Sequence, residues 1–127
     1  MASFPLFKDI AFSIYAVTDI KKSRAFYEGV LGLVPNDDYP AKEDSMWIEY
    51  NIGPGTLSIG CSPDWKPSSD GAVVALEAID FDVVMKKLKD AKVSFKLEPQ
   101  DFPSCKMAVV FDPDKNCVLI HQRKGKK

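Results

Sequence analysis

The chain has 127 residues, of which 46% are hydrophobic and 28% are charged, and its formal net charge is −1. This length and apolar content suit a single globular domain with a real core, which we expect to span residues 1–127. The 17 basic and 18 acidic residues are spread along the chain, which argues against a nucleic-acid or anionic-membrane partner.

The expected location is the cytoplasm. No apolar run approaches the roughly 18 residues that a membrane span needs, and residues 1–5 lack the basic-then-apolar pattern of a signal peptide. The three cysteines, Cys61, Cys105 and Cys117, form an odd and widely spaced set. Neither a disulfide framework nor a zinc knot is therefore expected, and free thiols suit a reducing compartment.

The chain opens with a predicted strand and helix. Residues 10–17 are rich in β-branched and aromatic side chains, which favours a strand. Thr18-Asp19 offers a capping side chain, and apolar residues then recur at three- and four-residue spacing from Ile20 to Leu31. Gly32 follows as the helix stop.

A hairpin is predicted next. Residues 33–40 form a polar connection that contains proline. Residues 45–52 and 56–61 are two apolar stretches joined by Gly53-Pro54-Gly55, which indicates a hairpin turn. A loop rich in Pro, Ser and Asp ends this half of the chain.

The same pattern then starts again. A strand over 72–76 precedes a second helix, whose apolar stripe is formed by Ile79, Val83, Val84 and Leu88 and which ends near Ala91. Three further strands are predicted over 93–97, 105–111 and 117–122, with Asp112-Pro113-Asp114-Lys115-Asn116 as the last turn.

The order βαβββ thus occurs twice, over about 8–61 and 71–122, with a linker over 62–70. The predicted helix starts, Ile20 and Ile79, are 59 positions apart, so the repeat holds in phase as well as in order. We expect an α+β fold in which the two repeats form a cupped, partly closed mixed sheet around a pocket, with one helix per repeat on the outside.

Three segments carry a resemblance to a known family: 16–20 (AVTDI), 25–33 (AFYEGVLGL) and 112–116 (DPDKN). Together with the duplicated order, they resemble the vicinal oxygen chelate superfamily, which includes glyoxalase I, bleomycin resistance proteins, fosfomycin resistance enzymes and extradiol dioxygenases. The resemblance covers residues 10 to 122. It departs at Lys115, where the turn of this family usually carries glycine.

The resemblance implies four metal-ligand positions, one on each of four strands. They fall at Phe12 (or Ala11, if a bulge shifts the register), Ser58, near Gly71, and Leu119. None offers a competent ligand, and the one histidine, His121, lies two residues beyond the last position. We therefore expect neither a metal nor another cofactor. The sequence accordingly argues against metal-dependent lyase or dioxygenase activity.

Strand alternation predicts which residues line the pocket in the second half. If the last hairpin pairs Phe111 with Cys117, Met107 lies opposite His121, and Cys105 is diagonal to it. Cys105 and His121 could form a thiol–imidazole pair, although no third group that orients the histidine is identifiable from the sequence. The residues predicted to face the pocket here are Cys105, Met107, Leu119 and His121.

Trp47 and Glu49 share one face of their strand, and Tyr50 lies on the other. If the first face lines the pocket, an indole beside a carboxylate could receive a flat or cationic ligand; otherwise Trp47 packs on a helix. The sequence leaves both registers open, and the same ambiguity applies to Phe12.

Three functions follow as alternatives. The first is a homodimeric binding protein, similar to bleomycin resistance proteins, that holds a small, mostly apolar or aromatic molecule in a metal-free pocket. The second is a metal-independent lyase- or isomerase-type enzyme, with His121 or Glu49 as proton carrier. The third is a dimerisation or regulatory module. The predicted ligand-binding residues are Phe12, Trp47, Glu49, Ser58, Cys105, Met107, Leu119 and His121, and the catalytic candidates are His121, Glu49 and Cys105.

Overall fold

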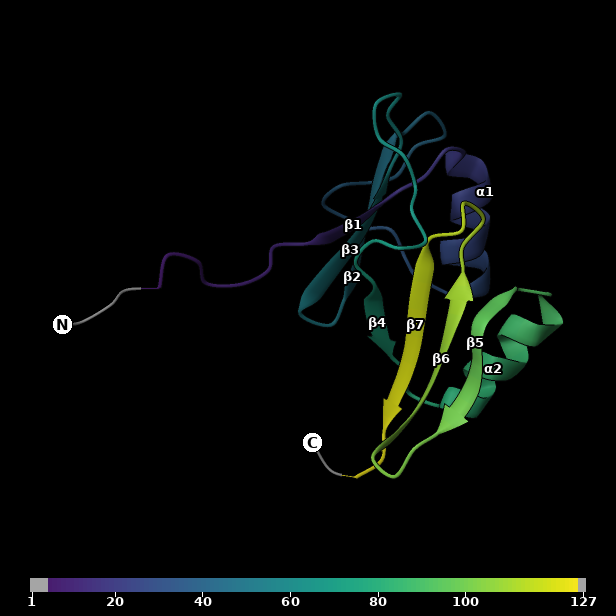
Figure 1. Cartoon of the computed structure of the whole chain (residues 1–127). Helices are drawn as coiled ribbons and strands as arrows, with labels where there is room; N and C mark the ends of the chain where they lie inside the picture. Colours follow the sequence, from purple (N-terminus) through teal and green to yellow (C-terminus); the bar gives the residue numbers. More distant parts are fainter. Residues whose placement is uncertain (1–4, 126–127) are drawn as a thin grey trace.

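The computed structural model describes residues 5–125. The two ends of the predicted domain, residues 1–4 and 126–127, lie outside this described range. Figure 1 shows two β-sheets, each accompanied by a helical segment. The elements in chain order are β1 (Ser13–Ala16), α1 (Ile20–Arg24), the π-helical segment η1 (Ala25–Val30), β2 (Trp47–Ile52), β3 (Gly55–Gly60), β4 (Val74–Glu77), α2 (Phe81–Asp90), β5 (Phe95–Asp101), β6 (Cys105–Phe111) and β7 (Cys117–Arg123). The predicted α+β class is confirmed.

The strand order shows the internal repeat. The first sheet has the order β1-β3-β2 and the second β4-β7-β6-β5. In each sheet the first strand of the repeat pairs in parallel with the last, and the other pairs are antiparallel. Instead of one partly closed sheet, the two repeats form separate open sheets of three and four strands.

The first repeat has one strand fewer than βαβββ predicts. Where the second repeat has β5, the first has an isolated bridge between Pro35 and Tyr50. Proline lacks the backbone N–H that a strand ladder needs, and Pro35 and Pro40 both lie in this connection. The chain therefore touches the sheet at one point and leaves it again.

The first helix forms as its capping residues predict. The Asp19 side chain accepts a hydrogen bond from the backbone N–H of Lys22 at 3.1 Å. The helical run continues through η1, and Gly32 then has a φ of +74°, a conformation that glycine adopts without steric cost.

The second helix begins two residues later than predicted. Asp80 is the N-cap, because its side chain accepts hydrogen bonds from the N–H groups of Asp82 and Val83. Ile79 therefore precedes the helix and is fully exposed. The buried face of α2 consists of Phe81, Met85 and Leu88 rather than the stripe predicted from Ile79 and Val83.

Several strand boundaries also differ from the prediction, most of all the start of the first strand and the end of β5. The first strand begins at Ser13, which pairs with Leu57 only two residues after β3 starts, so residues 10–12 lie beyond the ladder. Residues 5–12 form an extended arm that projects away from the body (Figure 1). Strand β5 runs to Asp101, past the predicted end at Leu97, and its pairing with β6 is irregular.

A single core joins the two repeats. At its centre the buried ring of Tyr27 stacks on Tyr15 and Tyr50, with centroid distances of 6.1 and 6.4 Å. The Tyr27 hydroxyl donates to Asp112 Oδ2 at 2.8 Å, and Asn116 Nδ2 donates to the Ala16 carbonyl at 2.8 Å. The predicted 112–116 turn therefore connects the second repeat to the first.

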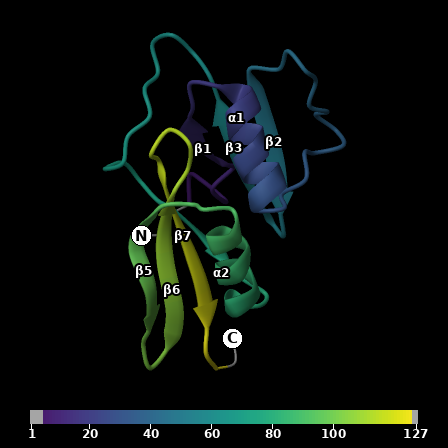
Figure 2. The same cartoon turned by 90° about the vertical axis from the view of Figure 1, so that its right-hand side faces the viewer.

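The helices cover only one face of each sheet. In Figures 1 and 2 both helices lie on the same side of the molecule, and the arm extends from the other side. Phe26 and Tyr27, which belong to η1, are buried in the core. Within the described chain, the opposite face of each sheet carries no helix and leaves its side chains uncovered by a helical layer.

Candidate functional site

The first sheet exposes an aromatic patch on the face away from α1. Ile48 and Tyr50 are fully buried in the core, so alternation places Trp47 and Glu49 on the opposite face. The ladder pairs Trp47 with Gly60 and Glu49 with Ser58. Of the two registers that the sequence left open, the structure therefore has the one in which Trp47 does not pack under the helix.

The aromatic rings of this patch contact each other directly. The Trp47 indole N–H donates to Glu49 Oε2 at 2.9 Å. Phe12 meets the Trp47 ring edge-on, at a centroid distance of 5.7 Å, and the Trp65 ring stacks on the Trp47 ring at a centroid distance of 6.5 Å and an interplanar angle of 22°. We call Phe12, Trp47, Glu49, Ser58 and Trp65 the tryptophan patch.

Trp65 was not predicted as a site residue. It lies in the loop after β3, where its backbone N–H donates to the Ser62 carbonyl at 3.1 Å. This hydrogen bond closes a turn that reverses the chain. Its ring packs against Gly60, because a Cβ atom there would lie only 3.0 Å from Trp65 Cζ3. The sequence signal for this contact was a glycine at the end of a strand, which often marks a close approach.

Ser58 is the polar residue beneath the patch. It is fully buried on the central strand β3, between Ile14 and Glu49 in the ladder. Its hydroxyl has no hydrogen-bond partner among residues 5–125. Most buried hydroxyls have a hydrogen-bond partner, and this one, which is shielded from solvent, has none among the described residues.

The second sheet carries the other predicted residues on its helix-free face. The ladder pairs Phe111 with Cys117 and Met107 with His121, so the predicted register is confirmed. The alternate residues Val110 and Val118 are fully buried in the core. Alternation therefore places Cys105, Met107, Leu119 and His121 on the helix-free face, and with Glu77 we call them the histidine patch.

Glu77 is the group that holds His121. His121 Nδ1 and Glu77 Oε1 are 2.6 Å apart, and Glu77 Oε2 accepts the backbone N–H of Arg123 at 2.7 Å. The hydrogen bond from His121, followed by that from Arg123, lowers the pKa of the Glu77 carboxyl. Glu77 was missed because its proximity depends on β4 pairing in parallel with β7, which aligns Glu77 with His121.

The thiol–imidazole pair suggested by the sequence does not form in this structure. Cys105 lies opposite Arg123 in the ladder, diagonal to His121 as predicted. Within the described part of the chain, no hydrogen bond joins the thiol to the imidazole, whose Nδ1 is engaged by Glu77. Cys105 and His121 do share a cavity of about 510 Å³ with Arg123 and Lys124.

The residues at the four implied metal positions do not fit a divalent ion. Phe12 and Leu119 have no donor atom, Ser58 offers one buried hydroxyl, and Gly71 lies in a loop before β4. Between residues 5 and 125 no three His, Cys, Asp or Glu side chains cluster as a metal site requires.

The predicted residues thus gather into two patches on different sheets. Tyr15 connects the sheets, since its hydroxyl donates to the Cys117 carbonyl at 2.6 Å and accepts from the N–H of Val74 at 2.9 Å. Burial raises the pKa of Tyr15 to about 12, so the hydroxyl stays protonated as a donor.

A cavity of about 450 Å³ opens between the hairpin of the first sheet and β4, with Thr56 and Glu77 in its lining.

Comparison with known proteins gives one family. The sequence model of the glyoxalase/bleomycin resistance protein/dioxygenase superfamily matches residues 9–120, whereas no curated protein sequence matches the chain. A glyoxalase/dioxygenase from Nostoc punctiforme superimposes with a TM-score of 0.79 at 16% identity, over 98% of this chain and 100% of that one.

Two further solved structures are similar. The antibiotic-binding protein TnmS3 from Streptomyces sp. CB03234 has a TM-score of 0.72 at 20% identity, over 95% of this chain and 100% of that one. The fosfomycin resistance protein FosX from Mesorhizobium loti has a TM-score of 0.66 at 15% identity, over 95% of each chain. At these identities the likeness establishes a shared fold.

Proposed function

Since the chain belongs to the glyoxalase/bleomycin resistance protein/dioxygenase superfamily, we propose that it binds a small, mostly apolar or aromatic molecule at the tryptophan patch. The observation that carries this proposal is the indole–carboxylate pair of Trp47 and Glu49, flanked by two further aromatic rings. The structural likeness to an antibiotic-binding protein and a fosfomycin resistance protein supports a binding role.

The patch favours a flat ligand with a donor or a positive charge at one edge. Aromatic side chains offer faces and edges for stacking, with preferred centroid distances of about 4.5 to 7 Å. Among the described residues, the Glu49 carboxylate accepts only one hydrogen bond, from the Trp47 indole, so it keeps acceptor capacity for a ligand. A cation placed here would meet both the carboxylate and the ring faces.

We propose that this binding needs no metal ion. The four metal-ligand positions that the family resemblance implies fall at Phe12 (or Ala11), at Ser58, near Gly71 and at Leu119, and these named residues supply a single hydroxyl. Elemental analysis of the purified protein tests this directly. Stoichiometric metal would contradict it and would mean that other side chains supply the ligands.

The proposed assembly is a homodimer. Residues 5–12 form an arm on which Leu6, Phe7 and Ile10 are each more than 80% exposed. Contiguous exposed apolar residues of this kind are typical of protein interfaces, and a second copy is the simplest partner. Light scattering should give twice the monomer mass, and the substitution of all three residues by serine should shift the protein toward the monomer.

We place the protein in the cytoplasm. All three cysteines are unpaired, which suits a reducing compartment. Between residues 5 and 125, no helix has the length and apolarity that membrane crossing requires. Fractionation of the native host's cells tests the assignment.

Tryptophan fluorescence provides the direct test of binding. The chain has two tryptophans, and both lie in the patch, so the whole indole signal reports from the proposed site. Titration with a panel of planar aromatic amines should quench or shift the emission saturably. Glu49→Gln should weaken the binding of cationic members, while the exposed control Asp70→Asn should leave it unchanged.

Two outcomes of the fluorescence titration would contradict the proposal. If no planar compound changes the emission below millimolar concentration, or if cationic and neutral members bind Glu49→Gln and the unmodified protein equally, the patch is not the site. Native mass spectrometry of protein purified under mild conditions adds a second readout, because a co-purified molecule would identify the ligand chemistry.

An alternative function is proton transfer by the histidine patch. The pairing of His121 with Glu77 favours it, because a carboxylate that orients an imidazole is the usual arrangement of a general base. Under this alternative, His121→Ala abolishes turnover of the bound molecule. Under the binding proposal, the same substitution leaves the affinity of the tryptophan patch unchanged.

A further inference from the structure

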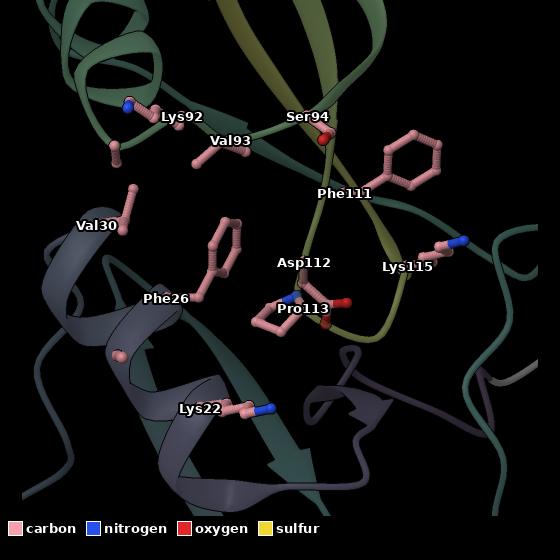
Figure 3. Close-up of a pocket in the computed structure, with 12 residues that line it drawn as sticks. Lys22, Phe26, Val30, Lys92, Val93, Ser94, Phe111, Asp112, Pro113 and Lys115 are labelled. Atoms are coloured by element: carbon pink, nitrogen blue, oxygen red, sulfur yellow. The ribbon is translucent and has the colours of Figure 1, made fainter.

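A groove on the helical side of the molecule is separate from both patches. Its volume is about 540 Å³. Figure 3 shows it between the first helical segment on one side and, on the other, the chain that follows α2 and the turn between β6 and β7. None of the site residues predicted from the sequence lines it.

The groove combines an apolar floor with a positively charged rim. Phe26 lies in the middle, with Val30, Val93 and Pro113 around it (Figure 3). Lys22, Lys92 and Lys115 stand at three corners and are all exposed. In the part of the chain that the structure describes, none of these three lysines forms an ion pair, although five other lysines and arginines and His121 do.

Two of these lysines occupy backbone conformations that favour glycine. Lys92 has a φ of +59° and Lys115 a φ of +68°, and no other non-glycine residue between 5 and 125 has a positive φ. Lys92 follows the end of α2, where the N–H of Val93 bonds to the Leu88 carbonyl at 3.1 Å, a position at which glycine is usual.

Lys92 and Lys115 share both an unfavourable backbone conformation and a place at the edge of the groove. A lysine at a left-handed position has a steric cost that glycine avoids. Both unfavourable positions in the described chain hold lysine, and both border the same groove. Backbone strain of this kind concentrates where a side chain has a function.

The one carboxylate in the lining does not neutralise the lysines. Asp112 is buried, and its oxygens accept hydrogen bonds from the Tyr27 hydroxyl, from Asn116 Nδ2 and from the backbone N–H groups of Asp114 and Asn116, each at 2.8 Å. This carboxylate is therefore directed into the protein and fully used there. The positive charge of the rim is left for a ligand.

We infer that this groove binds an amphipathic organic anion, namely a carboxylate attached to an apolar ring system. The ring system lies over Phe26 and Val30, and the carboxylate is held by the lysine rim. The site is independent of the tryptophan patch, and the ligand proposed there carries the opposite charge or none.

An NMR titration of the ¹⁵N-labelled full chain tests this inference, with naphthalene-2-carboxylate as the probe and the neutral naphthalene-2-carboxamide as its isosteric control. The carboxylate should shift the amide signals of Ala25, Val30, Val93 and Ser94 and bind more tightly than the carboxamide. Higher salt should weaken the binding, since exposed charges are screened.

The variant Lys92→Gly/Lys115→Gly makes the test specific. Glycine suits both backbone positions, so the variant should melt no lower than the unmodified protein while its affinity for the carboxylate falls by a factor of about three to ten. The control Lys42→Gln/Lys86→Gln removes the same charge from exposed positions outside the groove and should bind normally. Equal binding of acid and amide, unchanged affinity of the glycine variant, or shifts confined to residues outside the groove would each overturn the inference.

Discussion

Substitution of Gly60 by alanine probes the packing on which the tryptophan patch depends. An added Cβ would lie 3.0 Å from Trp65 Cζ3 and 3.2 Å from both Ile14 Cδ1 and Trp47 Cε3. Ordinary contacts between carbon atoms are about 3.5 to 4.0 Å, so all three side chains must move. The two indoles cannot keep their present stacking against each other once the methyl group is present.

The magnitude follows from two opposing effects. Overpacking of a well-packed site costs about 1 to 3 kcal/mol, whereas removal of a glycine from a strand recovers about 0.5 to 1 kcal/mol of chain entropy. We expect a net destabilisation of about 1 kcal/mol. With a urea m-value of about 2 kcal/mol/M, the unfolding midpoint should fall by about 0.5 M.

Urea unfolding and near-ultraviolet circular dichroism measure the two consequences. The dichroism of the stacked indoles should decrease, and affinity for planar ligands should fall with it. The control is Gly29→Ala, because a Cβ on this helical glycine meets nothing within 4 Å. That variant should gain about 0.5 to 1 kcal/mol. If Gly60→Ala keeps both the urea midpoint and the indole dichroism of the unmodified protein, the described contact between the tryptophans is wrong.

Three further predictions concern other parts of the fold. The pKa of Glu77 is lowered in the folded state, chiefly by the hydrogen bond from His121. The ionised carboxylate therefore stabilises the protein above the unfolded pKa near 4.5, and this contribution disappears as the pH falls. In thermal melts, Glu77→Gln should be less stable than the unmodified protein at pH 7 by at most about 1 kcal/mol, and the two should be indistinguishable at pH 2.5. Tyr27→Phe removes a donor from the buried Asp112 carboxylate and should cost about 1 to 3 kcal/mol in urea unfolding, and a smaller loss would mean that another donor replaces the hydroxyl. Lys115→Gly relieves a left-handed residue and should raise stability by about 1 kcal/mol, whereas a lower melting temperature would show that its side chain contributes more to packing than the backbone strain costs.

The two patches assign different roles to the two repeats. The first repeat presents stacked rings and one carboxylate, whereas the second presents an imidazole held by a carboxylate, next to a thiol and basic side chains. The two repeats therefore present surfaces of unlike chemistry. Only side chains on the helix-free faces differ in this way, since the opposite faces must both remain apolar to pack beneath a helix.

The sequence by itself determined the α+β class, the repeated order and the face on which most strand residues lie. These features depend on local patterns, because side chains alternate with a period of two in a strand and a hairpin turn sets the register of its neighbours. The pairing of Met107 with His121 could therefore be predicted from the turn between Phe111 and Cys117 alone.

The tertiary structure decided which distant residues become neighbours. Glu77 reaches His121 only because β4 pairs with β7, and Trp65 reaches Trp47 only because the loop after β3 folds back over Gly60. The division of the predicted site into two patches also depends on how the two sheets and their helices pack. So does the lysine-rimmed groove between the first helical segment and the chain that follows α2. Such contacts join residues tens of positions apart, and no local periodicity of side chains encodes which of the possible long-range pairings the packed core selects.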